Sequence, residues 1–538
     1  MSEKSFVKGA IVLSVAGILA KCLGALYRIP FARIATDECG AIYALVYPVY
    51  NLLLALSTAG IPLALSKLVA EYEEQGKSGM SLRILKLSLL LLASIGILVA
   101  VALFISADWI ATTIWEVPGA AVSLRMITPA MIFTCIQAVF RGYFQGMQQM
   151  VPTALSQITE QFVRVGVIFA ALFLLMPYGD EITAAGATAG AAVGSGVALL
   201  LMLTIFYGYR KKQKQNPAMA SRMEDLRESI SNSQVLQKVV VLAVPIAIGS
   251  LVLPVMQSID SILVLSRLQA GGMSLDAAKV AFNHLGNCVQ PIINLPFMIT
   301  TAVAASLVPN ISEALAMGHK EKVRETFANA MQLAILIVLP ATVGLMALAT
   351  PIMEMLYDKP AAGIPMFWSA AVVLVVGLYQ ISAGTLQGMG KAMVPMYSLL
   401  IGAAVKIILT YTLTAMPMFE IRGAALGSVI GFAVAAGNNI YQVSRKIGWG
   451  WLSAKYHVVK PVISVLFMAV LVLVSYSGVY HLLDSNGLAT LVSIMFGGCG
   501  YFVVLLAIGG VSLEIIRKVP KVGNKVAALL LKLNLVRG

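Results

Sequence analysis

Residues 84–107 read ILKLSLLLLASIGILVAVALFISA, and this stretch carries one charged side chain, Lys86, in twenty-four positions. A helix needs about 20 consecutive apolar residues to cross the hydrocarbon core of a bilayer. Thirteen further blocks of this kind lie between residues 6 and 513. Because a backbone that faces lipid must satisfy its hydrogen bonds within its own segment, each block is predicted to be a transmembrane helix.

The expected fold class is therefore an all-α integral membrane protein with about fourteen transmembrane helices. Apolar residues make up 59% of the chain and charged residues 12%, which excludes a series of soluble domains. The first block is too long for the apolar region of a signal peptide and contains Lys21, so we expect it to be retained. The predicted spans are about 6–27, 41–65, 84–107, 119–140, 152–176, 183–208, 238–265, 279–308, 327–349, 364–386, 394–416, 423–444, 460–482 and 488–513.

The positions of Lys and Arg predict the orientation. The N-terminus, the loops after even-numbered spans and the tail carry 28 of these residues, and the loops after odd-numbered spans carry 6. Since cytoplasmic loops are enriched in Lys and Arg, both termini are predicted to be cytoplasmic. The net charge of +14 is thus explained by topology and by contacts with membrane lipids, and no nucleic-acid partner is expected.

The chain repeats itself at an interval of about 242 residues. The sequence FQGM at residues 144–147 returns as LQGM at 386–389, and Val-Pro at 151–152 returns at 394–395. Two parallel six-helix lobes are predicted, related by an axis along the membrane normal, with a substrate site between them. The expected organisation is a first lobe at 1–208, a cytoplasmic linker at 209–237, a second lobe at 238–446, two additional helices at 447–513 and a basic amphipathic tail at 514–538.

Signatures of enzymes and metal sites are missing from the sequence. There is no P-loop, no HExxH and no GxSxG motif. The five Cys residues are scattered and form no CxxC pair, so neither a disulfide framework nor a zinc site is indicated. We expect a transporter without a catalytic motif, a cofactor or a metal.

Polar side chains inside the spans predict where a substrate would bind, because they are costly in lipid. Lys21 and Arg28 share a helical face, and Pro291 and Pro296 interrupt the polar face of the eighth span. Hydrogen bonding between packed helices is the alternative explanation. The candidate cavity residues are Lys21, Arg28, Asp260, Arg267, Lys279, Asn283, Asn287, Gln290 and Asn294.

Three further residues are secondary candidates. Glu160 and Arg164 are four positions apart on one helix and are expected to pair, and a structural role is the favoured interpretation. Lys406 has no carboxylate on its own predicted helix, so a partner must come from elsewhere.

Several motifs resemble the MurJ and stage V sporulation protein B family. The resemblance rests on KCLG at residues 21–24 with Tyr-Arg at 27–28, GIP at 60–62, RGYFQG at 141–146 and QPIINLP at 290–296. It covers nearly the whole chain. The sequence is thus similar to a branch of the multidrug/oligosaccharidyl-lipid/polysaccharide flippase superfamily.

The resemblance implies fourteen helices, alternating access and a cationic cavity lined by helices one, two, seven and eight. It also implies lipid II, the undecaprenyl-diphosphate-linked peptidoglycan precursor, as cargo. Lys21 matches a basic cavity residue of the family, whereas the family's next cavity arginine aligns with Tyr27, one place before Arg28. Some members bind sodium through carboxylates in helices seven and eleven, but the eleventh span here has Lys406 and no carboxylate.

The leading functional prediction is a flippase in the bacterial plasma membrane that moves lipid II outward, driven by membrane potential or an ion gradient. Expected partners are the lipid-linked oligosaccharide, membrane lipids and cell-wall synthesis enzymes. Three alternatives stay open: a flippase for another polyprenyl-linked glycan, a multidrug cation antiporter, and a membrane scaffold for sporulation or division. An antiporter for cations needs buried carboxylates, and the predicted cavity offers Asp260 alone.

Overall fold

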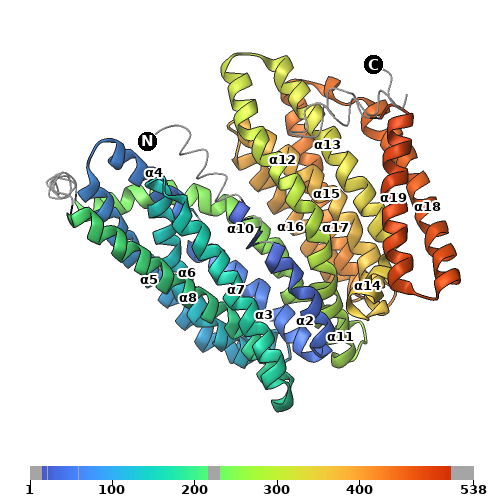
Figure 1. Ribbon diagram of the computed structural model, residues 1–538, viewed down its shortest axis with the longest axis horizontal. Helices are drawn as coiled ribbons and strands as arrows, with labels where there is room; N and C mark the ends of the chain where they lie inside the picture. Colours follow the sequence, from blue (N-terminus) through green and yellow to red (C-terminus); the bar gives the residue numbers. More distant parts are fainter. Residues whose placement is uncertain (1–14, 18, 21, 59, 216–230, 511–538) are drawn as a thin grey trace. The chain divides into compact units, whose positions relative to one another are not determined.

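The computed structural model describes residues 15–17, 19–20, 22–58, 60–215 and 231–510, and these residues form helices and connecting turns with no strand (Figure 1). Thirteen of the described helical segments are long and apolar enough to cross a membrane, and they correspond to thirteen predicted spans. The remaining span, 238–265, lies within helix α10, where side chains at 244–250, 252 and 253 are not described. The predicted all-α membrane fold is confirmed.

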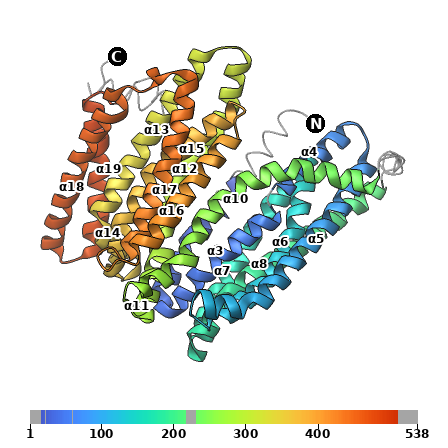
Figure 2. The same ribbon diagram turned by 180° about the vertical axis from the view of Figure 1, so that it is seen from behind.

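The chain divides into two compact units. Unit 1 comprises residues 1–266 and 274–283, and unit 2 comprises residues 267–273 and 284–538. Each is built from antiparallel helices joined by short turns (Figures 1 and 2). The helices of unit 1 are α2 (Arg28–Ile34), α3 (Asp37–Thr58), α4 (Ile61–Glu74), α5 (Ser78–Trp109), α6 (Ala120–Gly146), α7 (Met150–Leu175), α8 (Asp180–Gln215), most of α10 (Asn232–Ala270) and α11 (Leu275–Asn283). Those of unit 2 are α12 (Gln290–Ala316), α13 (Lys320–Ala347), α14 (Ala349–Tyr357), α15 (Gly363–Gly388), α16 (Met393–Leu413), α17 (Ile421–Ile447), α18 (Lys460–Leu483) and α19 (Asn486–Ala507).

The core of unit 1 fixes α6 at its centre. Val139 and Phe144 of α6 are fully buried against Leu65 of α4, Leu92 of α5 and Met202 of α8. The first turns of α10 also join this core through Val235 and Val239. Because α6 is packed on several sides, the polar side chains that it carries are held at fixed positions in the interior.

In unit 2 the last two helices dock on α13 through polar contacts. Gln332 of α13 donates to the carbonyl of Gly510 at 3.1 Å, and the Tyr501 hydroxyl of α19 donates to the carbonyl of Leu336 at 3.1 Å. Both views show α18 and α19 side by side at the edge of this unit (Figures 1 and 2). The two additional C-terminal helices expected from the sequence are therefore present as α18 and α19.

The eighth predicted span is interrupted, as its prolines indicate. Helix α11 ends at Asn283, residues His284–Val289 are π-helical, and α12 begins at Gln290. Pro291 has no backbone N–H and so cannot continue the hydrogen-bond ladder of the preceding turn. The division between the units falls between Asn283 and His284, so the chain leaves unit 1 where the regular helix stops.

The predicted linker and tail lie partly outside the described residues. Helix α8 continues to Gln215, past the expected end at 208, and α10 begins at Asn232, before 238. Residues 216–230 and the predicted amphipathic tail from residue 514 are outside the described chain, as is Lys21. The lobe limits 1–208 and 238–446 are derived from the internal sequence repeat, and they stay a prediction.

Candidate functional site

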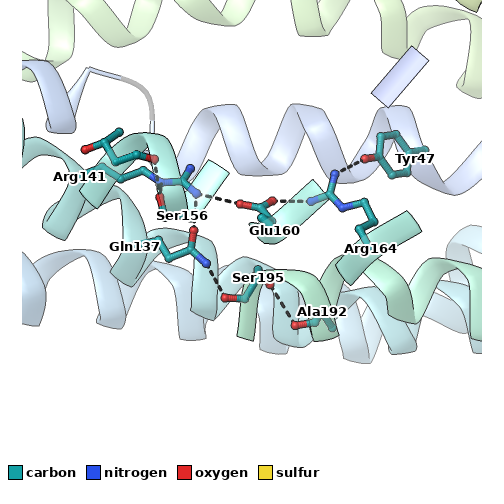
Figure 3. Close-up of polar contacts among 9 residues, drawn as sticks. Tyr47, Gln137, Arg141, Ser156, Glu160, Arg164, Ala192 and Ser195 are labelled. Carbon is teal, nitrogen blue, oxygen red and sulfur yellow. Dashed lines mark hydrogen bonds and ion pairs between the residues drawn. The ribbon is translucent and has the colours of Figure 1, made fainter. Parts of the chain in front are cut away.

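A buried polar network joins α3, α6, α7 and α8 inside unit 1 (Figure 3). We define it as Tyr47, Gln137, Arg141, Ser156, Glu160 and Arg164, together with the carbonyl of Ser195. Glu160 of α7 lies at its centre and accepts from two arginines, Arg141 at 2.9 Å and Arg164 at 2.5 Å. Glu160 is 7% exposed and Arg164 6%, so both charges are removed from solvent.

Each arginine of the network has further partners. Arg141 of α6 donates to Gln137 at 2.6 Å and to Ser156 at 2.9 Å. Gln137 in turn donates to the carbonyl of Ser195 in α8. Arg164 donates to the Tyr47 hydroxyl of α3 at 2.6 Å. Charge-assisted bonds of this kind compensate the cost of burying the three ionised groups.

A face of tyrosines on α3 extends the network toward α2. Tyr43, Tyr47 and Tyr50 are spaced by four and three residues and lie on one side of the helix. Neighbouring rings have centroids 5.3 Å and 5.8 Å apart. The Tyr43 hydroxyl is 2.7 Å from that of Tyr27, next to α2. The three tyrosines of α3 therefore form an ordered row of hydroxyl groups.

Two guanidinium groups converge on Tyr47. Arg164 binds its hydroxyl, and Arg28 lies over its ring, 5.5 Å from the centroid. Such cation–π contacts orient an arginine over the ring. Within the network, Arg141 and Arg164 carry two positive charges against one negative charge on Glu160, so the network has a formal charge of +1.

Three buried polar atoms beside this region have no hydrogen-bond partner within the described part of the chain. They are Nε of Arg164, the hydroxyl of Tyr50 and Oε1 of Gln157. Buried polar groups are almost always paired, with protein, with water or with a ligand. Nε of Arg164 and the Tyr50 hydroxyl can donate, so together with the positive charge they suit an anionic ligand with several oxygen acceptors, whereas Oε1 of Gln157 needs a donor such as water.

A second polar contact in unit 1 joins the start of α3 to α11, and we name it the α3–α11 clamp. Its members are Asp37, Glu38, Lys279 and Asn283. Lys279 pairs with Glu38 at 2.7 Å, and Asn283 donates to Asp37 at 2.8 Å. Gly40 permits this approach, because a Cβ atom at that position would lie 2.3 Å from Oδ1 of Asn283. The clamp therefore sits directly before the π-helical segment at which the chain passes to unit 2.

The remaining predicted site residues are distributed over both units. Asp260 of α10 is buried in unit 1. In unit 2, Arg267 lies over the ring of Tyr411 with its guanidinium carbon 4.0 Å from the centroid. Asn287 is buried in the π-helical segment, Gln290 and Asn294 are half-buried in α12, and Lys406 of α16 is 2% exposed. Thus the structure joins Arg28 to Glu160 and Arg164 through Tyr47, and Lys279 to Asn283 through the clamp.

Sequence reasoning missed several partners. The expected Glu160–Arg164 pair is present, but Arg141 was not among the candidates, and it holds the second oxygen of Glu160. The four-residue spacing of Gln137 and Arg141 on α6 was the available signal. Asp37 and Glu38 were also missed, because nothing in the sequence pairs them with residues more than 240 positions away.

Comparison with known proteins places the chain in a family. Residues 6–315 match the family model described as polysaccharide biosynthesis protein, and residues 245–412 match the model MatE. The chain is 31% identical over 521 residues to the uncharacterized membrane protein YabM of Bacillus subtilis, covering 95% of this chain and 94% of the relative.

Two further relatives from Bacillus subtilis have more informative names. Identity to stage V sporulation protein B is 29%, covering 81% of this chain and 82% of the relative. Identity to the lipid II flippase MurJ is 26%, covering 84% of each chain.

Solved structures show the same fold. An inward closed MurJ lipid II flippase has a TM-score of 0.65 at 15% identity and covers 92% of this chain and 98% of its own. An inward-facing multidrug resistance transporter of the MATE family has the same score and identity and covers 82% and 98%. The chain therefore belongs to the polysaccharide biosynthesis protein family, and it is a multi-pass membrane protein of the superfamily that contains the MurJ flippases and the MATE transporters.

Proposed function

We propose that this protein is a flippase that moves lipid II, an undecaprenyl-diphosphate-linked peptidoglycan precursor, from the inner to the outer leaflet of the bacterial plasma membrane. The observation that carries the proposal is the convergence of Arg28 and Arg164 on Tyr47, beside a buried network with a formal charge of +1. Guanidinium groups form paired hydrogen bonds with phosphate oxygens. A diphosphate supplies negative charge and oxygen acceptors to a network whose own net charge is positive.

The direction of transport follows from the charge of the cargo. With the cell interior negative, each negative charge that moves outward gains about 2.3 kcal/mol per 100 mV of membrane potential. A diphosphate carrying two charges is thus driven outward without ATP hydrolysis. An ion gradient is the second proposed source of energy, beside the membrane potential.

The α3–α11 clamp supports alternating access. Lys279 and Asn283 hold α11 on α3 immediately before the π-helical segment, and such segments are common where helices bend. We assign the clamp to a closed state of the outer side, in line with the predicted orientation in which both termini are cytoplasmic. Separation of α11 from α3 would break the two polar contacts of the clamp. Hydration of the released side chains would offset much of the free energy lost with these contacts.

The remaining predicted residues belong to the same proposal. Lys21, Asp260, Arg267, Asn287, Gln290, Asn294 and Lys406 are proposed to line the path of the polar headgroup or to support it. Cell-wall synthesis enzymes are the proposed partners, because they make and consume this precursor. A role in sporulation is also proposed, because one relative is named stage V sporulation protein B.

The MatE match at residues 245–412 favours one alternative function, export of organic cations. Such a substrate needs an available buried carboxylate. Glu160 is occupied by two arginines, and Asp260 is the carboxylate among the predicted cavity residues. A flippase for another polyprenyl-diphosphate glycan would use the same cationic region, and a non-transporting scaffold would have no use for it.

The direct test measures lipid II in cells. In a strain lacking every related flippase, loss of this protein is expected to leave lipid II in the inner leaflet, inaccessible to an added impermeant reagent. A plasmid copy of the protein should restore accessibility. Normal exposure of lipid II in the strain without any of these proteins would contradict the cargo assignment and favour another glycan.

Lys21 provides a test at the residue level, based on the sequence. The substitution Lys21→Ala is expected to reduce transport about tenfold, because it removes a cation within a membrane span that would otherwise meet the diphosphate. Lys21→Arg should keep most of the activity, and Lys21→Glu should be inactive. Complementation of the flippase-deficient strain, with protein abundance measured in parallel, gives the result. Full rescue by Lys21→Ala would remove this residue from the proposed path.

A further inference from the structure

Three cationic side chains meet at one end of unit 2, and we name them the basic triad: Lys391, Arg445 and Lys446. Lys391 lies in the turn between α15 and α16, and the other two lie in the last turn of α17. Leu386 at the end of α15 and Val443 at the end of α17 are buried in one hydrophobic cluster, so the turn that carries Lys391 lies beside the end of α17. The charges of Lys446 and Arg445 act on Lys391 at this position. Arg445 and Lys446 are exposed and Lys391 is partly exposed, so a ligand in the surroundings can reach all three.

The backbone holds this arrangement in place. Gly390 adopts a φ of 72° and closes the end of α15, where the N–H of Lys391 donates to the carbonyl of Leu386 at 2.8 Å. At the end of α17, Ser444 accepts from the indole of Trp451 at 2.8 Å. Because both segments are anchored, the backbone positions that carry the three side chains are fixed, and the side chains keep their rotamer freedom.

The positive charges of the triad are not neutralised by carboxylates of the described chain. Among the described residues, no carboxylate forms an ion pair with Lys391, Arg445 or Lys446. Partial desolvation and the neighbouring charges of Lys446 and Arg445 lower the pKa of Lys391. Three like charges on neighbouring segments repel one another, and an anion between them relieves this repulsion. A phosphate offers enough oxygens to bind all three.

The position of the triad identifies the source of that phosphate. The membrane spans of α15, α16 and α17 end or begin at Gly388, Met393 and Ile447, so Lys391 lies between two span ends, and Arg445 and Lys446 lie in the last turn of the third span. Two aromatic residues beside it, Tyr397 and Trp449, are each 56% exposed. Exposed Tyr and Trp at span ends are typical of the membrane interface, where lipid headgroups lie.

We propose that the basic triad is a binding site for the phosphate of anionic glycerophospholipids in the adjacent leaflet. Lysine and arginine clusters beside transmembrane helices attract such lipids through their surface charge. The site differs from the arginine and tyrosine cluster of unit 1 in place and in ligand, so it does not depend on the identity of the transported cargo.

The experiment measures lipids retained by the full-length protein. The protein is reconstituted in bilayers containing phosphatidylglycerol and phosphatidylcholine, extracted gently and analysed by native mass spectrometry. The triple variant Lys391→Gln/Arg445→Gln/Lys446→Gln is compared with Lys320→Gln/Lys322→Gln/Lys455→Gln, a control that removes the same charge from exposed positions of unit 2. The triad variant is expected to retain about fivefold less phosphatidylglycerol than the native protein, and the control should retain nearly as much as the native protein.

Three outcomes would overturn the proposal. Equal losses in the two variants would mean that general surface charge attracts the lipid. Unchanged retention in the triad variant would mean that the lipid binds elsewhere. Displacement of phosphatidylglycerol by millimolar inorganic phosphate, added in a separate arm, would identify the ligand as a free anion. A thermal unfolding curve like that of the native protein shows that the triad variant is folded.

Discussion

A protein with the substitution Arg164→Ala is expected to lose transport by about a hundredfold while it still folds and inserts. The substitution removes the guanidinium that donates to the Tyr47 hydroxyl, and it lowers the formal charge of the network from +1 to zero. Truncating one member of a buried charged contact typically costs about 3 kcal/mol of binding. Glu160 keeps a partner, since Arg141 still donates to it at 2.9 Å, so the carboxylate is not left unpaired.

Two further variants separate a role in transport from a role in folding. Arg164→Lys restores the charge without the planar fork, and we expect partial transport. Arg125→Ala is the matched control, because Arg125 is also a membrane-span arginine paired with a carboxylate, Asp108, but both side chains are exposed. Its loss should leave transport close to native. Native transport by Arg164→Ala would contradict the proposed site, and equal loss of protein in both Arg164 variants would show a purely structural role.

The sequence predicts most of the fold because span length and apolar composition are local properties. Residues 84–107, for example, need no tertiary information to be recognised as a membrane helix, and α5 contains them all. Helix ends are less predictable, because α8 and α10 extend beyond the apolar blocks into polar sequence. The interruption of the eighth span was predictable from Pro291, although the π-helical form of residues 284–289 was not.

The site was predictable only where its partners lie on one helix. Glu160 and Arg164 are one turn apart, and their pairing follows from the helical period. Arg141 and Tyr47 approach the same pair from α6 and α3, and no spacing in the sequence records this. The interpretation of Glu160 and Arg164 as a structural pair therefore assumed one carboxylate and one arginine. In the structure a second arginine, Arg141, also binds this carboxylate.

Closing the α3–α11 clamp by a covalent bond is expected to stop transport almost completely. The double variant Glu38→Cys/Lys279→Cys, made after replacing the five native cysteines, puts two thiols where an ion pair of 2.7 Å now joins α3 to α11. A direct disulfide needs Cα atoms within about 7 Å of each other. A Glu–Lys ion pair is closed by two long side chains, so the two thiols are joined by a short bis-methanethiosulfonate reagent that forms a reducible disulfide with each. If α11 must leave α3 for cargo to reach the outer side, the crosslink blocks the cycle and a reductant restores it.

The ion pair between Asp108 and Arg125 supplies the control for this crosslink. It joins the end of α5 to α6 within unit 1, and nothing in the proposed cycle requires these helices to separate. The same reagent joining Asp108→Cys to Arg125→Cys should therefore leave transport unchanged, although it constrains the same unit. Lipid II accessibility is measured in crosslinked cells before and after reduction, with the crosslinked fraction determined by a mobility shift. Full transport in cells where nearly all of the clamp is crosslinked would show that α3 and α11 stay together throughout the cycle, and the clamp would then be a permanent helix contact instead of a gate.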